Sequence, residues 1–291
     1  MMIRLVVVDI DGVVSPGEAA PLDFAVLQRL ATCNDRARHD PARAAVTLCT
    51  GRPAPYVEVL MQAIHGFYPA IYEHGAGLYV PEPYGFKSHP VLTSAIQARL
   101  MQLQTVLPDA LVATDLAYFQ PGKSASLSLF ARAGVPLPEV ARVASRLAHL
   151  CGDAFLVEEG ATCVNVLVRG LDKAEGVRWL ARETGIPLCH MAGVGDARGD
   201  APFMQLVSWS AAPANAHPSV KQLAHYTSPY EDGLGLVDIL TRLEAHCHNL
   251  APSPAAHQCD SLTASFSSLP GTQGRPHCSE RPTGVSATRP N

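Results

Sequence analysis

The chain has 291 residues, of which 47% are hydrophobic and 16% are charged, with a formal net charge of −4. This composition can build a hydrophobic core, which excludes global disorder, and it provides no basic footprint for nucleic acid. No apolar run is long enough for a transmembrane helix, and the N-terminus lacks the features of a secretory signal, so we expect a cytoplasmic protein.

The first part of the chain alternates short apolar strands with helices. The β-branched run at 3–8 predicts a strand buried on both faces, and a helix is expected at 21–32. A second buried strand at 44–49 precedes a helix at 54–65, and a further short strand covers 69–72. This alternation of strands and helices is typical of a parallel α/β sheet.

The alternation of strands and helices stops over residues 81–90, where several prolines and a glycine occur. The elements expected next are a helix at 91–107, strands at 110–119 and 124–131 that pair as a hairpin, a helix at 137–150, and strands near 153–157 and 162–168. We interpret residues 82–166 as an inserted α+β module, because this pattern differs from the parallel rhythm on both sides of it.

After the insertion, the chain returns to the alternating strands and helices of a parallel sheet. The expected elements are a helix at 172–185, a strand at 188–194, a strand near 206–211, and helices near 217–224 and 233–246. Residues 1–81 and 167–247 would then form the main domain. Residues 248–291 are rich in Pro, Ser and Thr without an aliphatic pattern, which predicts a disordered tail.

Polar side chains follow three of the predicted main-domain strands. They are Asp9 and Asp11, then Thr50, then Asp196 with Asp200. Lys173 begins the helix before the last of these strands. Because ligands bind beyond the carboxyl ends of the strands in an open parallel sheet, we expect all of these groups to converge on one edge.

This set of side chains is suited to phosphoryl transfer. Carboxylates that crowd together repel one another unless a cation lies among them, and hard oxygen ligands favour Mg²⁺. A metal and a lysine can neutralise phosphate oxygens as charge moves. One carboxylate can act as the nucleophile, while a second, two residues on, protonates the leaving oxygen and later deprotonates water.

Four ordered segments resemble the motifs of the haloacid dehalogenase superfamily of phosphatases. They read LVVVDIDGVVS, VTLCTGRP, GLDKAEGVRWL and GVGDARGDAPFM. The segment EHGAGLYV is similar to the E-N-G-A segment of the Cof-like and sugar-phosphatase branch (subclass IIB), with His74 in place of the common Asn. The resemblance covers about residues 1–245 and implies a Rossmannoid α/β core with an inserted cap at 82–166.

The resemblance also implies a role for each matching residue. Asp9 would be the nucleophile and a Mg²⁺ ligand, and Asp11 would be the acid/base and bind Mg²⁺ through its backbone carbonyl. Thr50, with the amide of Gly51, would hold the transferring phosphate, and Lys173 would steady both that phosphate and Asp9.

In the last motif, Asp196 would bind Mg²⁺, and Asp200 would support it directly or through water. Asn215 occupies a position where the family often has an Asn that lines the site, and Arg52 would either contact the substrate or brace its loop.

The segment Gly122-Lys123-Ser124 invites comparison with a phosphate-binding P-loop. That motif requires a glycine five residues before Gly122, where this chain has Ala117, so we exclude nucleotide binding there. We interpret Lys123 as a solvated residue of the predicted hairpin, with contact to a substrate anion from the cap as the alternative.

The resemblance implies a Mg²⁺-dependent phosphomonoester hydrolase that works through an aspartyl-phosphate. Its substrate would be a small phosphorylated metabolite, such as a sugar phosphate or phosphoglycolate. Two alternatives stay open: a phosphomutase of the same fold, and a non-catalytic regulatory or binding protein.

Overall fold

A computed structural model describes residues 2–249. Its central sheet consists of five parallel strands in the order β12-β11-β10-β1-β2. These strands are β1 (Leu5–Val8), β2 (Ala45–Leu48), β10 (Met191–Val194), β11 (Trp209–Ala212) and β12 (Tyr226–Thr227). The predicted parallel α/β sheet is therefore confirmed, and β12 is an edge strand that the sequence patterns did not predict.

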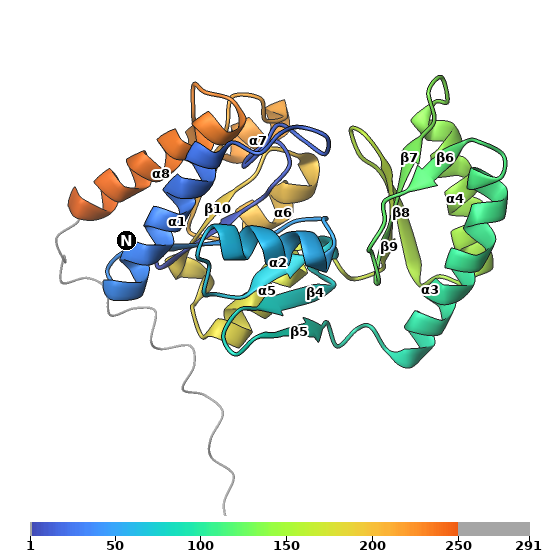
Figure 1. Cartoon of the computed structure of the whole chain (residues 1–291), viewed down its shortest axis with the longest axis horizontal. Coiled ribbons are helices and arrows are strands. Elements are labelled where there is room, and N and C mark those ends of the chain that lie inside the picture. The colour runs from blue at the N-terminus through green and yellow to red at the C-terminus, as the bar shows by residue number, and fades with distance from the viewer. Residues whose placement is uncertain (1, 250–291) are drawn as a thin grey trace, which may run out of the picture. The chain divides into compact units, whose positions relative to one another are not determined.

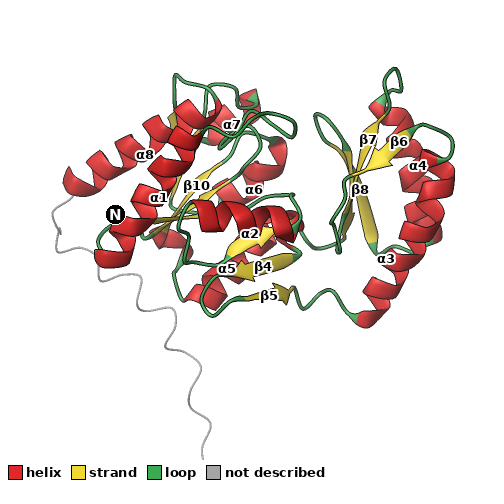
Figure 2. Cartoon of the chain, viewed as in Figure 1, coloured by secondary structure: helices red, strands yellow, loops and turns green. Residues whose placement is uncertain are grey.

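Helices cover both faces of this sheet (Figures 1 and 2). Val6 and Val8 of β1 belong to one core cluster with residues of α1 and α8, whereas Leu5 and Val7 belong to another with residues of α5 and α6. The helices are α1 (Phe24–His39), α2 (Ala54–Ala63), α5 (Lys173–Thr184), α6 (Ala201–Met204), α7 (Pro218–Leu223) and α8 (Asp232–Asn249). Alternate side chains of a strand point to opposite faces, so a fully apolar strand lies between two helical layers.

A second, antiparallel sheet joins β3 (Ala70–Tyr72), β4 (Gly77–Val80) and β5 (Gly85–Ser88). The short strand predicted at 69–72 is present as β3, and it belongs to this second sheet. It meets the parallel sheet through a parallel bridge between Cys49 and Ile71, beside which the amide of Thr50 donates to the carbonyl of Ile71 at 3.1 Å.

A third sheet is antiparallel, with the order β6-β7-β9-β8, and packs against α3 and α4. Its elements are β6 (Ala117–Phe119), β7 (Leu127–Ala131), β8 (Phe155–Glu159), β9 (Val164–Val168), α3 (Ser94–Leu107) and α4 (Leu137–Leu150). The predicted hairpin is present as β6–β7. The strand predicted at 110–119 was too long, because Pro108–Val112 form a π-helical turn after α3. Leu103, Leu107 and Leu111 are fully buried at a four-residue spacing, so helical packing decides this segment.

Other predictions have a mixed outcome. The predicted cap boundary at residue 82 falls in the connection between β4 and β5, and the division into core and cap stays a prediction. Helix α8 extends to Asn249, and the remainder of the predicted tail, 250–291, lies outside the described residues. Within residues 2–249, no helix has the length and hydropathy needed to cross a membrane.

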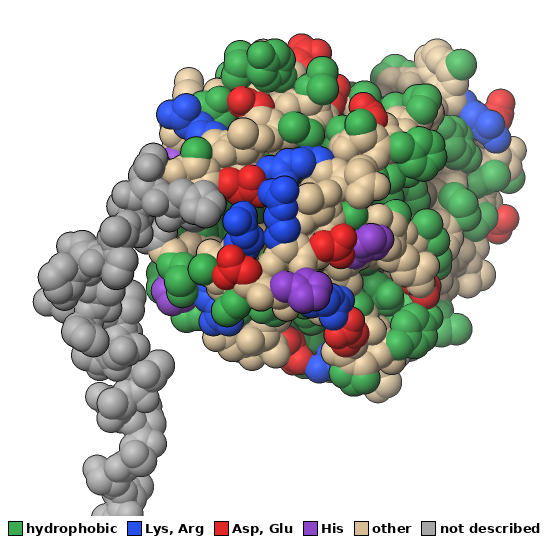
Figure 3. All heavy atoms as spheres, turned by 60° about the vertical axis from the view of Figure 1, so that its left-hand side comes forward, with side chains coloured by type: hydrophobic (Ala, Val, Ile, Leu, Met, Phe, Trp, Pro, Cys, Tyr) green, Lys and Arg blue, Asp and Glu red, His purple; other side chains and the backbone are tan. Residues whose placement is uncertain are grey.

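On the face in Figure 3, a small group of Lys and Arg side chains lies beside Asp and Glu side chains.

Candidate active site

Three carboxylates meet at the carboxyl edge of the central sheet. Asp9 directly follows β1, and its amide donates to the carbonyl of Val194, the last residue of β10, at 3.0 Å. Oxygens of Asp9, Asp196 and Asp200 all lie within 4.8 Å of one another. The convergence expected from strand ends in a parallel sheet is present in the structure.

Lys173 lies inside this cluster. Its Nζ is 2.8 Å from Oδ2 of Asp9 and 2.6 Å from Oδ1 of Asp200. The residue opens α5, whose preceding residue, Asp172, caps the helix by accepting a hydrogen bond from the amide of Glu175. The cap fixes the first turn of α5, and with it the direction in which the lysine enters the cluster.

Asp200 organises the loop after β10. Its Oδ2 accepts hydrogen bonds from the amides of Asp196 and Ala197 at 3.0 and 2.9 Å, while its Oδ1 accepts from Lys173. A Cβ on Gly195 would lie 2.4 Å from the Cβ of Asp200, so only glycine fits there. Asp200 is fully buried, and its oxygens already have three donors, which makes it a support for Asp196 and Lys173.

The electrostatics of the cluster show an excess of negative charge. Burial and the charge of Asp200 raise the pKa of Asp9 well above its usual value, although Lys173 opposes this shift. Burial and Asp200 likewise raise the pKa of Asp196 to about 7. Burial opposes the charge of Lys173, but Asp200 and Asp9 outweigh it and raise the pKa of the lysine. One ammonium does not balance three neighbouring carboxylates, so the cluster favours an additional cation.

The residues present fit a divalent metal such as Mg²⁺. Within the described part of the chain, Oδ1 of Asp196 is one of the few buried side-chain atoms that have no hydrogen-bond partner. A buried carboxylate oxygen without a donor is costly, and hard carboxylate oxygens are ligands that Mg²⁺ prefers. Gly12 has φ +83°, and a Cβ there would lie 2.3 Å from Oδ2 of Asp196, so the turn after Asp11 comes close to this carboxylate.

Asp11 is held by Arg52. The guanidinium donates from Nε to Oδ2 of Asp11 at 2.8 Å and from its terminal nitrogen to Oδ1 at 2.7 Å. The guanidinium also stacks over the ring of Tyr56 at 4.8 Å. Burial disfavours the charge of Arg52, but the bonded Asp11 outweighs it and raises the pKa of Arg52. Arg52 therefore braces Asp11 at the rim of the site, and the Asp11 side chain is not part of the three-carboxylate cluster.

Thr50 and Gly51 form a narrow turn beside the cluster. The buried Thr50 hydroxyl accepts a hydrogen bond from the amide of Arg52 at 3.1 Å. A Cβ on Gly51 would lie 2.4 Å from Nε2 of His74, so the imidazole closes over this turn. Burial lowers the pKa of His74 well below its usual value, helped by the charge of Lys123, so the ring is neutral.

Asn215 supports the Gly12 turn. Its Nδ2 donates to the carbonyl of Gly12 at 2.8 Å, and its Oδ1 accepts from the amide of Asp232 at 2.8 Å. Both the nitrogen and the oxygen of the side-chain amide are thus bonded to the chain itself. The structure places Asn215 in the wall of the site, where its contacts position the loop that follows Asp11.

These residues line one cavity of about 280 Å³. The sequence-predicted residues in its wall are Asp9, Asp11, Thr50, Gly51, Arg52, Lys123, Lys173, Asp196 and Asn215. Asp200 lies behind the wall, in contact with Lys173. The interpretation of Lys123 as a solvated hairpin residue was wrong, because the third sheet brings it into this cavity.

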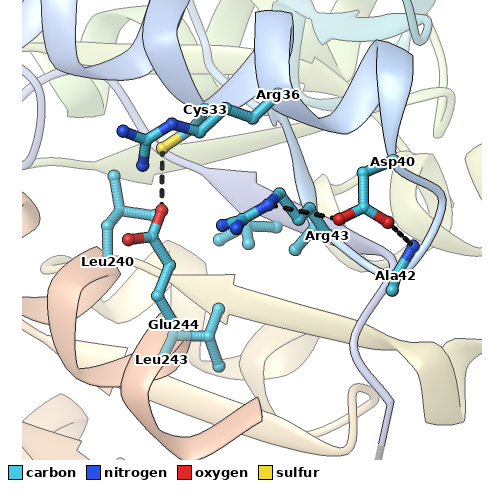
Figure 4. Close-up of a pocket in the computed structure, with 10 residues that line it drawn as sticks. Cys33, Arg36, Asp40, Ala42, Arg43, Leu240, Leu243 and Glu244 are labelled. Atoms are coloured by element: carbon cyan, nitrogen blue, oxygen red, sulfur yellow. Dashed lines mark hydrogen bonds and ion pairs between the residues drawn. The ribbon is translucent and has the colours of Figure 1, made fainter. Parts of the chain in front are cut away.

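A second cavity of about 120 Å³ lies between α1, α8 and the start of β2. Figure 4 shows Arg43 pointing to Asp40, and the Cys33 thiol to Glu244. Glu244 also pairs with Arg29 at 2.9 Å. The charges that face this cavity are largely paired within the chain, and none of the predicted site residues lies in it.

Sequence reasoning missed part of the wall that the third sheet contributes. Ser128 of β7 and Asn165 of β9 line the cavity, and Ser128 Oγ is 2.5 Å from Asn165 Oδ1. It also missed Glu73, a fully buried carboxylate. Two signals were available for Glu73: its position directly after a buried strand, and its place as the first residue of the segment EHGAGLYV. Ser128 and Asn165, in contrast, fall within ordinary strand patterns.

Comparison with known proteins relates part of the chain to one family. Residues 134–240 match the model of the haloacid dehalogenase-like hydrolase family. A phosphoglycolate phosphatase of Methanothrix thermoacetophila is 36% identical over 90 residues, which are 31% of this chain and 40% of that protein. A second, from Pyrobaculum aerophilum, is 34% identical over 101 residues, 35% of this chain and 43% of that protein. The match thus spans about two fifths of the length of these curated relatives.

Solved structures resemble the chain over much more of its length. A Thermoplasma acidophilum protein aligns with a TM-score of 0.65 at 19% identity and covers 84% of this chain and 99% of its own. A haloacid dehalogenase-like hydrolase of Bacteroides thetaiotaomicron gives 0.65 at 16% identity, with coverages of 83% and 99%. The sucrose-phosphatase of Synechocystis, solved with sucrose and phosphate, gives 0.60 at 14% identity, with coverages of 84% and 99%. At these identities the likeness establishes the fold.

Proposed function

We propose that this haloacid dehalogenase-like chain, of the Cof-like branch, is a Mg²⁺-dependent phosphomonoester hydrolase. One observation carries the proposal: Asp9, Asp196, Asp200 and Lys173, which come from separate segments of the chain, form one cluster at the cavity, and this cluster has a surplus of negative charge. The partial match to two phosphoglycolate phosphatases supports the same reaction class.

In the first step, a carboxylate oxygen of Asp9 attacks the phosphorus of the bound monoester. The bond between phosphorus and the leaving-group oxygen breaks, and Asp11 gives that oxygen a proton, which leaves an aspartyl-phosphate. The ion pair with Arg52 fixes the position of the Asp11 side chain in the wall of the cavity.

In the second step, Asp11 takes a proton from water. The water oxygen attacks phosphorus, the bond to Asp9 breaks, and inorganic phosphate leaves with the Asp9 carboxylate restored. Lys173 keeps Asp9 oriented through its 2.8 Å contact. Thr50 and the amide of Gly51, at the turn that His74 closes, would hold the phosphoryl oxygens.

Asp9 and Asp196 would hold Mg²⁺, with the backbone carbonyl of Asp11 as a further ligand. When bound, the ion would neutralise charge on the phosphoryl oxygens and relieve the repulsion among the carboxylates. Asp200 would act on Asp196 through the two amides that it binds.

The size of the cavity limits the size of the substrate. Its volume of about 280 Å³ is slightly below the roughly 300–1,000 Å³ of small-molecule sites, which favours a small phosphorylated metabolite such as phosphoglycolate or a sugar phosphate. The predicted cap, residues 82–166, would select the leaving group and exclude water from the first step. A cytoplasmic location stays a prediction.

A phosphatase screen tests the proposal. Phosphate release is measured over a panel of phosphorylated metabolites with Mg²⁺ and with a chelator, for the parent protein and for Asp9→Asn. We expect Mg²⁺-dependent turnover of at least one small monoester and a loss of at least about 1,000-fold in the variant. Equal turnover by the variant and the parent would refute the proposal.

A further inference from the structure

Of the described cations that line the cavity, Lys123 is the one that has no carboxylate partner. Arg52 pairs with Asp11, and Lys173 pairs with Asp9 and Asp200. Within residues 2–249, Lys123 has no ion pair within 4 Å, and its Nζ donates to Oγ of Ser128 at 2.5 Å. Among the described cations that line this cavity, Lys123 is thus the one without a carboxylate partner, and its ammonium remains available to a ligand.

The position of Lys123 is fixed by the residues that follow it. Oε1 of Glu73 accepts from the amide of Ser124 at 2.9 Å and from its hydroxyl at 3.2 Å. Oε2 accepts from the amides of Ala125 and Ser126 at 2.8 Å each and from the hydroxyl of Ser126 at 3.0 Å. We call this set of bonds the Glu73 clamp. It anchors the backbone next to Lys123 to the end of β3.

The surroundings of Lys123 make its charge costly in the absence of an anion. Burial lowers the pKa of Lys123 to about 8, although the charge of Glu73 partly opposes this shift. The group that Nζ contacts is the neutral hydroxyl of Ser128, which forms the adjacent wall together with Asn165. The charged groups that act on Lys123, namely Glu73, Arg52 and Asp11, make no ion pair with it. A ligand anion would compensate the desolvated ammonium, and it would also find hydrogen-bond donors in this wall.

We propose that Lys123, positioned by the Glu73 clamp, recognises a carboxylate on the leaving group of the phosphomonoester. This inference rests on the proposed hydrolase activity and narrows its substrate class. A carboxylate carries one negative charge, which one ammonium balances. A second phosphate would bring up to two charges, and the described cavity wall holds no second cation free of a carboxylate.

Two substrates of similar size separate the effect of charge from that of shape. Phosphoglycolate carries a carboxylate where hydroxyethyl phosphate carries a neutral hydroxymethyl group. We expect the parent to prefer phosphoglycolate, and we expect Lys123→Met to lower the ratio of the two kcat/KM values about 10- to 100-fold. Lys123→Arg should restore part of the preference, because it restores the charge.

Lys87→Met is the matched control. Lys87 lies on β5 and pairs with Glu183, outside the cavity, so the ratio should stay at the parent value. A parent without preference, or an equal loss on both substrates in Lys123→Met, would overturn the inference while the hydrolase proposal stands. If the parent hydrolyses no phosphomonoester with Mg²⁺, the hydrolase proposal fails and the inference fails with it.

Glu73→Gln tests the positioning role of the clamp. We expect KM for phosphoglycolate to rise more than KM for hydroxyethyl phosphate, because the shifted ammonium matters only to the charged leaving group. General damage to the fold would instead lower kcat/KM for both substrates alike. That outcome would contradict the claim that Glu73 positions Lys123. The Lys123 variants would then decide whether Lys123 recognises the carboxylate.

The pH dependence gives an independent test. Lys123 is charged below about pH 8 and neutral above it, so the preference for phosphoglycolate should decline as the pH rises through that value. The groups facing Lys123 are Glu73, Cys163, Arg52 and Asp11, and burial raises the pKa of Cys163, which keeps its thiol neutral there. In Lys123→Arg the preference should stay constant over the same range, because arginine remains charged. A decline in both proteins would contradict the assignment.

Discussion

Replacing Glu73 by Gln should destabilise the fold, because the clamp uses both carboxylate oxygens. Glutamine has one oxygen, and its NH₂ group is a donor. In the better of its two orientations, the NH₂ faces the amide of Ser124, while the oxygen keeps the bonds to Ala125 and Ser126. One amide loses its acceptor, at about 1–3 kcal/mol, and the remaining bonds lose the strength that charge provides. We expect Glu73→Gln to lower the free energy of unfolding by about 2–4 kcal/mol.

Urea unfolding followed by far-UV circular dichroism measures this loss. Ser124→Ala is the matched control: it removes one long hydroxyl contact of an exposed residue, and it should lower the free energy of unfolding by less than about 1 kcal/mol. A Glu73→Gln variant within about 0.5 kcal/mol of the parent would show that the clamp does not contribute to stability as the hydrogen bonds imply.

Three further outcomes are expected at the metal cluster and the loop beside it. Gly12→Ala should lower Mg²⁺ affinity at least about tenfold by calorimetry, because its Cβ would press on the Asp196 carboxylate; unchanged affinity would contradict this close approach. Mg²⁺ should raise the melting temperature of the parent and leave that of Asp196→Asn nearly constant, and an equal rise in both would place the ion elsewhere. Asn215→Ala should lower the free energy of unfolding by about 1–3 kcal/mol and reduce kcat more than it changes KM, because its amide binds Gly12 and Asp232; a change in KM alone would instead indicate direct substrate contact.

The sequence allowed the parallel sheet and its edge of carboxylates to be predicted. The run from Leu5 to Val8 is apolar throughout, as a strand between two helical layers requires, and Asp9 and Asp196 follow neighbouring strands. The carboxyl ends of parallel neighbouring strands lie at the same edge of the sheet, so the sequence alone indicates that Asp9 and Asp196 lie close together.

The wall provided by the third sheet could not be predicted in the same way. Lys123 and Ser128 resemble the polar residues of any exposed hairpin, and only the folding of β6–β9 toward the first strand ends brings them to the cavity. The Glu73 clamp joins residues about fifty positions apart, and hydrogen bonds to backbone amides leave no trace in side-chain pattern. The alternating sequence around Leu111 also led to a wrong prediction of a strand, because Leu111 packs as part of a helical turn.

The central claim is that Asp9 accepts the phosphoryl group. The most direct measurement uses a monoester with a radiolabelled phosphoryl group, mixed with excess protein and Mg²⁺, quenched in acid within one turnover and mapped by proteolysis. We expect label on the peptide that contains Asp9, and none in Asp9→Asn. Label on another residue, or normal single-turnover hydrolysis with no labelled protein at any time, would contradict it.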